Sequence, residues 1–333
     1  MPGSSWLSRL PSPSVRLQRG FAIAALVANS VVSVTGSVVR VTGSGLGCPT
    51  WPECVPGSWV PVAHPELSAF HQWVEFGNRL LFGVVGIAGA LCFIAALLAR
   101  PRRRRVLLLS LTMPLGVVVQ AVVGGITVLA GLVWWTVALH FLPSMVLIWL
   151  AALLVKAVGE GDEPPRPLVP RPLLALRWVF VVVLYAMLVA GTLVTAAGPH
   201  GGDADTPRLE LPVSSLAQLH ADLLFVYLGM LVALGFTLRA VAAHTALRRS
   251  YWVLVAVVLA QGALGMVQYL AGVPEVMVVL HVLGATLVVM ATTAVWVACR
   301  DRGPVPAPTP PAGPAAAQQD VAAERVDSTP ISA

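Results

Sequence analysis

The segment QAVVGGITVLAGLVWWTVALH at residues 120–140 aligns without a gap with QGALGMVQYLAGVPEVMVVLH at residues 261–281. Eight of the 21 positions are identical, and they include Gln120 with Gln261 and His140 with His281. Matches between Leu and Val arise easily by chance in apolar helices, but a matched Gln and His twenty residues apart do not. The pattern therefore indicates that one structural unit is present twice in the chain.

The composition places this duplicated unit in a membrane. Of the 333 residues, 57% are hydrophobic and only 11% are charged, which is too little polar surface to cover a water-soluble globule of this size. A helix needs about 20 apolar residues to cross the hydrocarbon layer. Eight stretches are long enough, at residues 20–40, 74–98, 106–129, 133–158, 173–197, 216–241, 250–272 and 275–299. The sequence predicts an all-α polytopic membrane protein whose eight transmembrane helices form two pseudo-symmetric four-helix bundles.

Lys and Arg stay on the cytoplasmic side of a membrane during insertion. With a cytoplasmic N-terminus, 18 of the 21 Lys and Arg residues fall inside, and only Arg40, Arg79 and Arg208 fall outside. The net charge of +6 is therefore a signal of topology, with no reason to invoke nucleic acid. We expect a multi-pass protein of the cell (plasma) membrane, with both termini in the cytoplasm and the first apolar stretch retained as a helix.

Five segments follow from this topology. They are a cytoplasmic N-terminus at 1–19, an N-terminal four-helix half at 20–158, a cytoplasmic linker at 159–172, a C-terminal four-helix half at 173–299, and a cytoplasmic tail at 300–333. Much of the tail is Pro and Ala with nothing to pack, so we expect it to be disordered.

The repeat also aligns the second and sixth apolar stretches. With an offset of 142 residues, His220 falls opposite Asn78, while His140 and His281 match at an offset of 141. All four residues lie within a few positions of the predicted outer end of a helix. They should therefore share one depth in the membrane.

A single membrane histidine is often only a hydrogen-bond donor between helices. Three at matched depth favour a binding site, because two imidazoles on facing helices can hold a porphyrin iron between them, whereas zinc needs further ligands nearby. The sequence predicts that His220 and His281 are such a haem pair, with Asp222 and Gln261 as the other polar neighbours.

The first half offers His140 but has Asn78 where the second imidazole is expected. Glu75, Asn78 and Arg79 fall on one helix face because their spacing is i, i+3 and i+4. One interpretation is a plain interfacial salt bridge. The alternative is that Arg79 pairs with a porphyrin propionate while Glu75 faces the reacting edge and moves protons.

The loop after the first apolar stretch reads VVRVTGSGLGCPTWPEC at residues 38–54. Its Cys48 and Cys54 fall on the predicted outer, oxidising side, which favours a disulfide. A metal site is the alternative, but no cluster of His or carboxylate residues completes it. The disulfide could be a structural staple or a redox-active pair. Cys92 and Cys299 read as small packing residues.

These motifs resemble the haem A synthases of bacteria and mitochondria, in a variant of actinobacterial type that has Asn in place of the first His. The resemblance rests on the run from Arg40 to Cys54, on Glu75-x-x-Asn78-Arg79, and on three histidine segments, ALHFL, QLHAD and VLHVLGA. It implies a haem b in the C-terminal half, ligated by His220 and His281. It also implies a substrate haem site in the N-terminal half that involves His140 and Glu75.

The resemblance further implies the reaction. The C8 methyl group of haem O would be oxidised to an alcohol and then to a geminal diol, which loses water to give the formyl group of haem A for terminal oxidase assembly. Haem O synthase and the cytochrome oxidase assembly machinery are the implied partners, and the electron donor stays open.

The chain departs from the better-known family pattern, Glu-x-x-His-Arg, at Asn78. His71 is two helical turns upstream, about 10 Å away along the axis, so it does not replace the missing imidazole. Binding through His140 alone would leave one iron face open. Two rival hypotheses remain, a di-haem b-type membrane electron carrier and an assembly or transport protein without stoichiometric haem.

Overall fold

The computed structural model describes residues 10–63 and 65–307. The described chain forms eight long helices, and each is long and apolar enough to cross a membrane, as predicted. They are α1 (Val15–Val41), α2 (Ala69–Leu98), α3 (Arg104–Leu129), α4 (Trp134–Val158), α5 (Arg171–Ala197), α6 (Val213–Ala240), α7 (Thr245–Leu270) and α8 (Glu275–Ala298).

Several helices begin earlier than the apolar stretches suggested. The first, second and seventh each start five residues upstream of the predicted position. An apolar stretch marks only the part that fits in hydrocarbon, while helical hydrogen bonding continues until a cap ends it. The side chain of Ser14 caps α1 by accepting from the Leu17 N–H at 3.2 Å, and His244 caps α7 in the same way.

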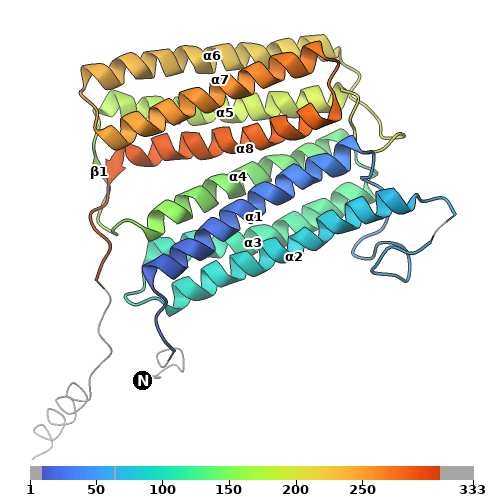
Figure 1. Cartoon of the computed structure of the whole chain (residues 1–333), viewed down its shortest axis with the longest axis horizontal. Coiled ribbons are helices and arrows are strands. Elements are labelled where there is room, and N and C mark those ends of the chain that lie inside the picture. Colours follow the sequence, from blue (N-terminus) through green and yellow to red (C-terminus); the bar gives the residue numbers. More distant parts are fainter. Residues whose placement is uncertain (1–9, 64, 308–333) are drawn as a thin grey trace, which may run out of the picture.

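The eight helices form two groups that lie side by side (Figure 1). One group is α1 to α4 and the other is α5 to α8. Helices α1 and α4 of the first group both pack against α8 of the second, which makes α8 the main joint between the halves. We call the end of the bundle at which residues 10 and 307 lie the inner end, and the opposite end the outer end.

The two halves are packed differently. In the N-terminal half, each helix packs closely on two neighbours, so α1, α2, α3 and α4 form a closed ring. In the C-terminal half, α5 packs closely on α6 and α7 on α8, but these two pairs have few contacts with each other. The C-terminal half is therefore a pair of helical hairpins with a seam between them.

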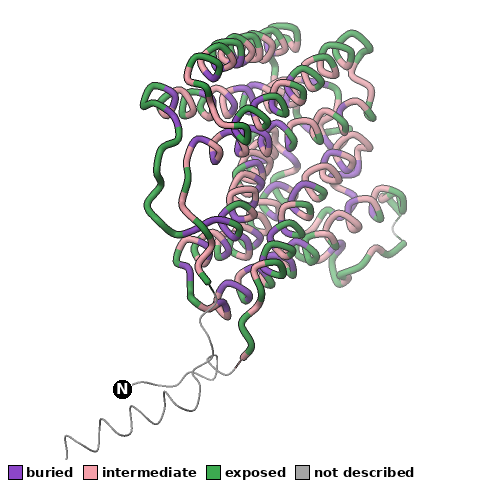
Figure 2. The backbone as a smooth tube through the Cα atoms, turned by 60° about the vertical axis from the view of Figure 1, so that its left-hand side comes forward, coloured by how far each residue is buried: buried purple, intermediate pink, exposed green. Residues whose placement is uncertain are grey.

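The buried side chains are smaller in the closely packed N-terminal half than in the C-terminal half. Ala22 and Ala25 of α1 and Ala151 and Ala157 of α4 are almost fully buried, and small residues allow helix backbones to approach closely. The C-terminal core instead uses large side chains from all four helices, among them Leu184, Tyr227, Leu254 and Val289. Outward-facing positions along the helices are exposed and mostly apolar, as a lipid-facing surface requires (Figure 2).

The start of the C-terminal tail corrects one prediction. Residues 300–333 were expected to be disordered, but β2 (Arg300–Asp301) pairs antiparallel with β1 (Arg166–Pro167) in the linker. Sequence composition cannot reveal such a pairing, because the two strands are only two residues long and lie far apart in the chain. Residues 308–333 lie outside the described part of the chain.

Ion pairs reinforce this contact at the inner end. The Glu160 carboxylate binds Arg105 at the start of α3 and, at 2.9 Å, Arg300 after α8. Burial raises the pKa of Glu160, but hydrogen bonds from Arg300 and Arg105 outweigh burial and leave the pKa below its ordinary value. Arg103 binds Asp162 of the same linker at 2.6 Å. The linker therefore ties the inner ends of both halves together.

Candidate functional site

His220 of α6 and His281 of α8 face each other near the outer end of the C-terminal half. Their ring centroids are 6.2 Å apart and their planes are tilted by 56°. A metal–nitrogen bond to imidazole is about 2 Å long and a ring centroid lies about 1 Å behind its nitrogen, so two imidazoles on one metal would have centroids about 6 Å apart. The observed separation therefore matches the spacing of two imidazoles that bind one metal ion from opposite sides.

Each imidazole of this pair rests against a glycine of the neighbouring helix. A Cβ built on Gly191 of α5 would lie 3.2 Å from Cε1 of His220, and one built on Gly265 of α7 would lie 3.0 Å from Cε1 of His281. In both cases Nδ1 is the next closest ring atom. The Cε1–Nδ1 edge of each ring is thus packed against backbone, which leaves Nε2 as the nitrogen that can bind a metal.

Hydrogen bonds fix the two histidines further. His220 Nδ1 lies 2.9 Å from the Met187 carbonyl oxygen, which accepts only if Nδ1 carries the proton. Nε2 of His220 then keeps its lone pair, as a metal ligand must. On the other side, Gln261 Nε2 donates to the backbone carbonyl of His281 at 2.9 Å. Gln261 thus holds the helix turn that carries the ligand.

The donor set suits haem. Among residues 10–63 and 65–307, no three His, Cys, Asp or Glu side chains gather as a metal site. A haem brings four porphyrin nitrogens of its own, so two imidazoles complete its coordination. Asp222 does not belong to the site, because it is exposed and accepts from Gln218 at 2.7 Å on its own helix.

His140 of α4 repeats this arrangement in the N-terminal half. A Cβ on Gly124 of α3, the repeat partner of Gly265, would lie 3.0 Å from Cε1 of His140. Within the described chain, its buried Nδ1 has no hydrogen-bond partner. Gln120 Nε2 donates to Ser144 Oγ at 2.8 Å, and Ser144 Oγ donates to the His140 carbonyl at 3.0 Å. The same glutamine position therefore supports the histidine helix in both halves, directly in one and through a serine in the other.

Asn78 occupies a different environment from its repeat partner His220. Its Oδ1 accepts from Thr35 Oγ1 of α1 at 2.7 Å. The α1 sequence Val-Thr-Gly-Ser at 34–37 matches Val-Ala-Gly-Thr at 189–192 of α5, so Gly36 corresponds to Gly191. Yet no described atom lies within 4 Å of a Cβ built on Gly36. The second imidazole is missing, and a threonine engages the amide that replaces it.

Glu75 and Arg79 form a clamp on the outer loop. They pair with each other at 2.6 Å, and Glu75 Oε2 accepts from the Cys48 N–H at 2.7 Å. Arg79 also donates to the carbonyl oxygens of Cys48, Thr50 and Glu53, at 2.6, 3.0 and 3.3 Å. The predicted salt-bridge alternative is therefore present, and it anchors the loop that carries the cysteine pair.

The anchored loop covers the histidine side of the N-terminal half. The Cys48 and Cys54 sulfur atoms are 2.04 Å apart, which is a bonding distance, and both residues are buried. Trp51 packs over Gly125, where a Cβ would lie 2.7 Å from its ring. Gly125 follows the glycine that backs His140. His71, by contrast, points to the loop, with its Nδ1 2.9 Å from Ser44 Oγ.

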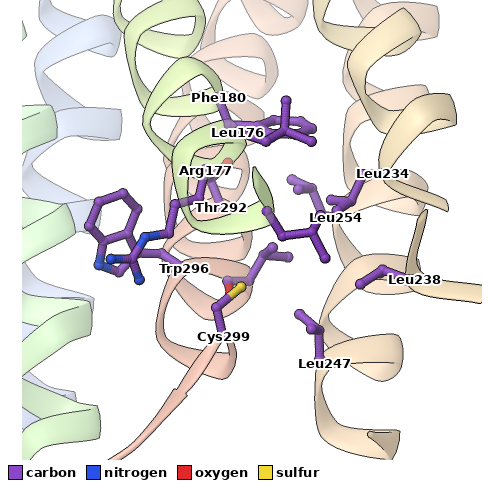
Figure 3. Close-up of a pocket in the computed structure, with 12 residues that line it drawn as sticks. Leu176, Arg177, Phe180, Leu234, Leu238, Leu247, Leu254, Thr292, Trp296 and Cys299 are labelled. Carbon is purple, nitrogen blue, oxygen red and sulfur yellow. The ribbon is translucent and has the colours of Figure 1, made fainter. Parts of the chain in front are cut away.

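A cavity in the C-terminal half lies far from these residues. A mostly apolar cavity between the four helices of the C-terminal half is lined by Leu234 and Leu238, with Arg177 stacked 4.1 Å from the ring centroid of Trp296 (Figure 3). Leu234 is 14 residues after His220 on the same helix, about 20 Å toward the inner end. The cavity is therefore not part of the candidate site.

The roles of some of these residues were not predicted from the sequence. Gln120 was visible in the repeat but had no role until its chain of hydrogen bonds to His140 was seen. Thr35 had no signal at all, because a threonine in an apolar helix is unremarkable by composition. The glycines behind the histidines could have been found in the repeat for Gly124 and Gly265, which are identical positions of the aligned segments.

Two related four-helix halves, each with a glycine-backed histidine near its outer end, define a polytopic membrane bundle with a matched histidine in each half. Residues 19–200 match the cytochrome oxidase assembly protein family (COX15-CtaA). This match covers more than half of the chain, and the chain belongs to that family.

Several relatives have the name "Heme A synthase". That of Lysinibacillus sphaericus is 31% identical over 183 residues, which are 53% of this chain and 57% of the relative. That of Geobacillus kaustophilus is 32% identical over 150 residues, 44% of this chain and 45% of the relative. The chain thus spans about half the length of these two relatives. A longer match, 26% identical over 266 residues, covers 76% of this chain and 87% of the protein of Halalkalibacterium halodurans.

Proposed function

We propose that this protein is a haem A synthase, which oxidises the C8 methyl group of haem O to the formyl group of haem A. The observation that carries the proposal is the His220–His281 pair at haem-ligating separation, in a chain of this family. The names of the matched relatives point to the same activity. The reaction would be two successive two-electron oxidations of the methyl carbon, each replacing a C–H bond with a C–OH bond, through an alcohol and a geminal diol that loses water. The oxygen atoms would come from outside the protein, either from O2 with an electron donor or from water with an electron acceptor.

In this proposal the C-terminal half holds haem b through His220 and His281. The bound haem would supply one-electron redox chemistry. The protein's own contribution there is positioning, because Gly191, Gly265 and Met187 fix the ring edges and leave both Nε2 atoms to the metal. Gln261 holds the backbone of the second ligand.

The N-terminal half would bind haem O as substrate, with His140 as the iron ligand and Asn78 on the opposite side. Asn78 is held by Thr35 and its amide is a poor iron ligand compared with imidazole, so one iron face would stay open. This asymmetry is the reason to favour an enzyme over a di-haem electron carrier. A carrier needs two fully ligated haems, and Asn78 does not supply the fourth imidazole.

Glu75 is the proposed catalytic acid and base of the N-terminal site. Arg79 is the proposed partner of a substrate propionate, and it would release a loop carbonyl to pair with one, because Glu75 and three loop carbonyls now engage its guanidinium. Two observations support a role for Glu75 beyond surface charge. The residue is 5% exposed, and it lies one helical turn before Asn78. Its second oxygen is held by the Cys48 N–H, which fixes the carboxylate beneath the outer loop.

The outer loop is proposed to carry a Cys48–Cys54 disulfide on the oxidising side of the plasma membrane, with both termini in the cytoplasm. The excess of arginine at the inner end supports this orientation, and an oxidising outer side favours the disulfide. Mass spectrometry under non-reducing conditions should find the two cysteines linked. Free thiols in freshly trapped cells would instead favour a cycling redox pair.

The deciding experiment is haem extraction and chromatography from cells with and without this gene. We expect haem A to disappear and haem O to accumulate in the deletion strain, and the wild-type gene on a plasmid to reverse both changes. A plasmid with His281→Ala should not. Unchanged haem A in the deletion strain would exclude the proposed function. Haem O synthase is the expected source of the accumulated substrate. The cytochrome oxidase assembly machinery is the expected recipient of the product.

A further inference from the structure

Two arginines meet at the outer end where the halves join. Arg40, at the end of α1, donates from Nη1 to the His200 carbonyl at 3.0 Å, and Arg208 donates from Nη2 to the Pro199 carbonyl at 2.9 Å. Arg40 packs its stem against Gly202, and the Arg208 guanidinium lies directly against Gly201. Both side chains therefore lie along one short piece of the loop between α5 and α6.

Neither guanidinium is neutralised. The ion pairs within the described chain all involve other arginines, and no described carboxylate lies within 4 Å of Arg40 or Arg208. Two donors beside them are buried without a hydrogen-bond partner among the described residues, Arg208 Nη1 and the hydroxyl of Thr206, whose residue is 7% exposed. Neighbouring like charges and unsatisfied buried donors are each costly, so the combination indicates an anion site.

The position of this cluster selects the anion. Arg208 lies five residues before α6. His200 Nε2 binds the carbonyl of Val273, two residues before α8, at 2.8 Å. The loop is thus fastened across the outer ends of the two helices that carry His220 and His281. Those imidazoles lie seven and six residues inside their helices, about 10 Å below the cluster along the axes.

We propose that Arg40, Arg208 and the Thr206 hydroxyl bind the propionate carboxylates of the haem held by His220 and His281. This inference rests on the proposed haem site. A guanidinium presents two parallel N–H donors that match a carboxylate, which is why arginine suits this task. Because Arg40 belongs to the N-terminal half, the haem carboxylates would also join the two halves. Gly45 N–H already bonds the Gly202 carbonyl at 2.7 Å across the same junction.

The test compares haem b with its dimethyl ester, which lacks both carboxylates, in titrations of full-length detergent-solubilised protein from haem-deficient cells. Arg40→Gln and Arg208→Gln should each weaken haem b binding at least tenfold, since each removes a charge-assisted hydrogen bond to a carboxylate. Neither should weaken binding of the ester. Arg249→Gln, at an exposed inner position, removes the same charge and should change neither ligand. Arg208→Lys should restore part of the haem b affinity.

Three results would overturn the proposal. Equal weakening of haem b and ester would show that the arginines only hold the loop. Unchanged binding of both would show that they do not meet the haem. Loss of co-purifying phospholipid from the variants, with haem b affinity intact, would assign the cluster to a lipid phosphate. A wild-type protein that binds neither ligand would instead refute the haem site itself, which separates that failure from failure of the arginine assignment.

Discussion

The two halves share one plan but differ in closure and in ligands. The N-terminal half is a closed ring of helices around one histidine, and the C-terminal half is two hairpins with one histidine on α6 and one on α8. A glycine packs against each of the three imidazoles. Gly124, Gly191 and Gly265 each lie against a histidine ring, whereas Gly36, the counterpart of Gly191, lies against none. Under the proposed function, this difference separates a half that retains a cofactor from a half that receives a substrate.

The largest effect should come from removing a ligand of the C-terminal pair. His220→Ala or His281→Ala should abolish a low-spin b-type spectrum in the purified protein, because one imidazole cannot fill both axial positions. His71→Gln is the control and should keep the spectrum, because the His71 ring bonds Ser44 of the outer loop and lies outside the C-terminal half. Retention of the spectrum in both alanine variants would contradict the assignment and remove the main difference between the halves.

Next in size is the effect of Glu75. Glu75→Ala should stop conversion of haem O while the C-terminal haem stays bound, because the two sites lie in different halves. Glu75→Gln keeps an oxygen for the Cys48 N–H and so separates proton transfer from anchoring of the loop. If the glutamine variant is as active as wild type, Glu75 acts only as an anchor. Haem extracts and the optical spectrum report the two sites separately.

Asn78 allows the asymmetry itself to be reversed. In the wild type, the N-terminal iron should be high-spin when ferric and should bind carbon monoxide when reduced. Asn78→His should supply the missing imidazole, convert this iron to low spin and lower haem A formation. Thr35→Ala, which only removes the partner of Asn78, should leave the spin state unchanged. A wild-type N-terminal iron that is already low-spin and inert to carbon monoxide would show that another residue is the sixth ligand.

A smaller effect should follow from the matched glutamines. Gln261→Leu removes the hydrogen bond to the His281 carbonyl, which contributes about 1 kcal/mol net, so haem b should bind about fivefold more weakly. Gln120→Leu should leave that affinity unchanged, because Gln120 supports His140 instead. The exposed Gln218→Ala is the matched control. Equal effects of Gln261→Leu and Gln120→Leu on the C-terminal haem would deny the separation of the two halves.

The smallest effect concerns the joint between the halves at the inner end. The pKa of Glu160 is lowered in the folded protein. Its pairing with Arg105 and Arg300 therefore stabilises the fold at any pH above 4.5, the ordinary pKa of a glutamate. That contribution should be lost as pH falls from 4.5 through the lowered pKa. At pH 7, Glu160→Gln should lower the melting temperature by a few degrees. If the variant and wild type differed equally at pH 7 and pH 3, the ion pairs would not be the cause.

Sequence pattern alone predicts the eight helices, the duplicated unit and the shared depth of His140, His220 and His281. These properties are local or periodic: about 20 apolar residues cross the hydrocarbon whatever their neighbours, and a ligand's depth follows from its distance to the helix end. The sequence also identified Glu75, Asn78 and Arg79 as one helix face, because helical periodicity alone decides that.

The contacts of those residues are visible only in the folded structure. Thr35 reaches Asn78 from another helix, Arg79 reaches three loop carbonyls, and Arg40 meets a loop 160 residues further along the chain. The same holds for β1 and β2, and for Gly191 behind His220. Such contacts depend on how helices pack against one another, which is a sum over many distant side chains that no local pattern in the sequence encodes.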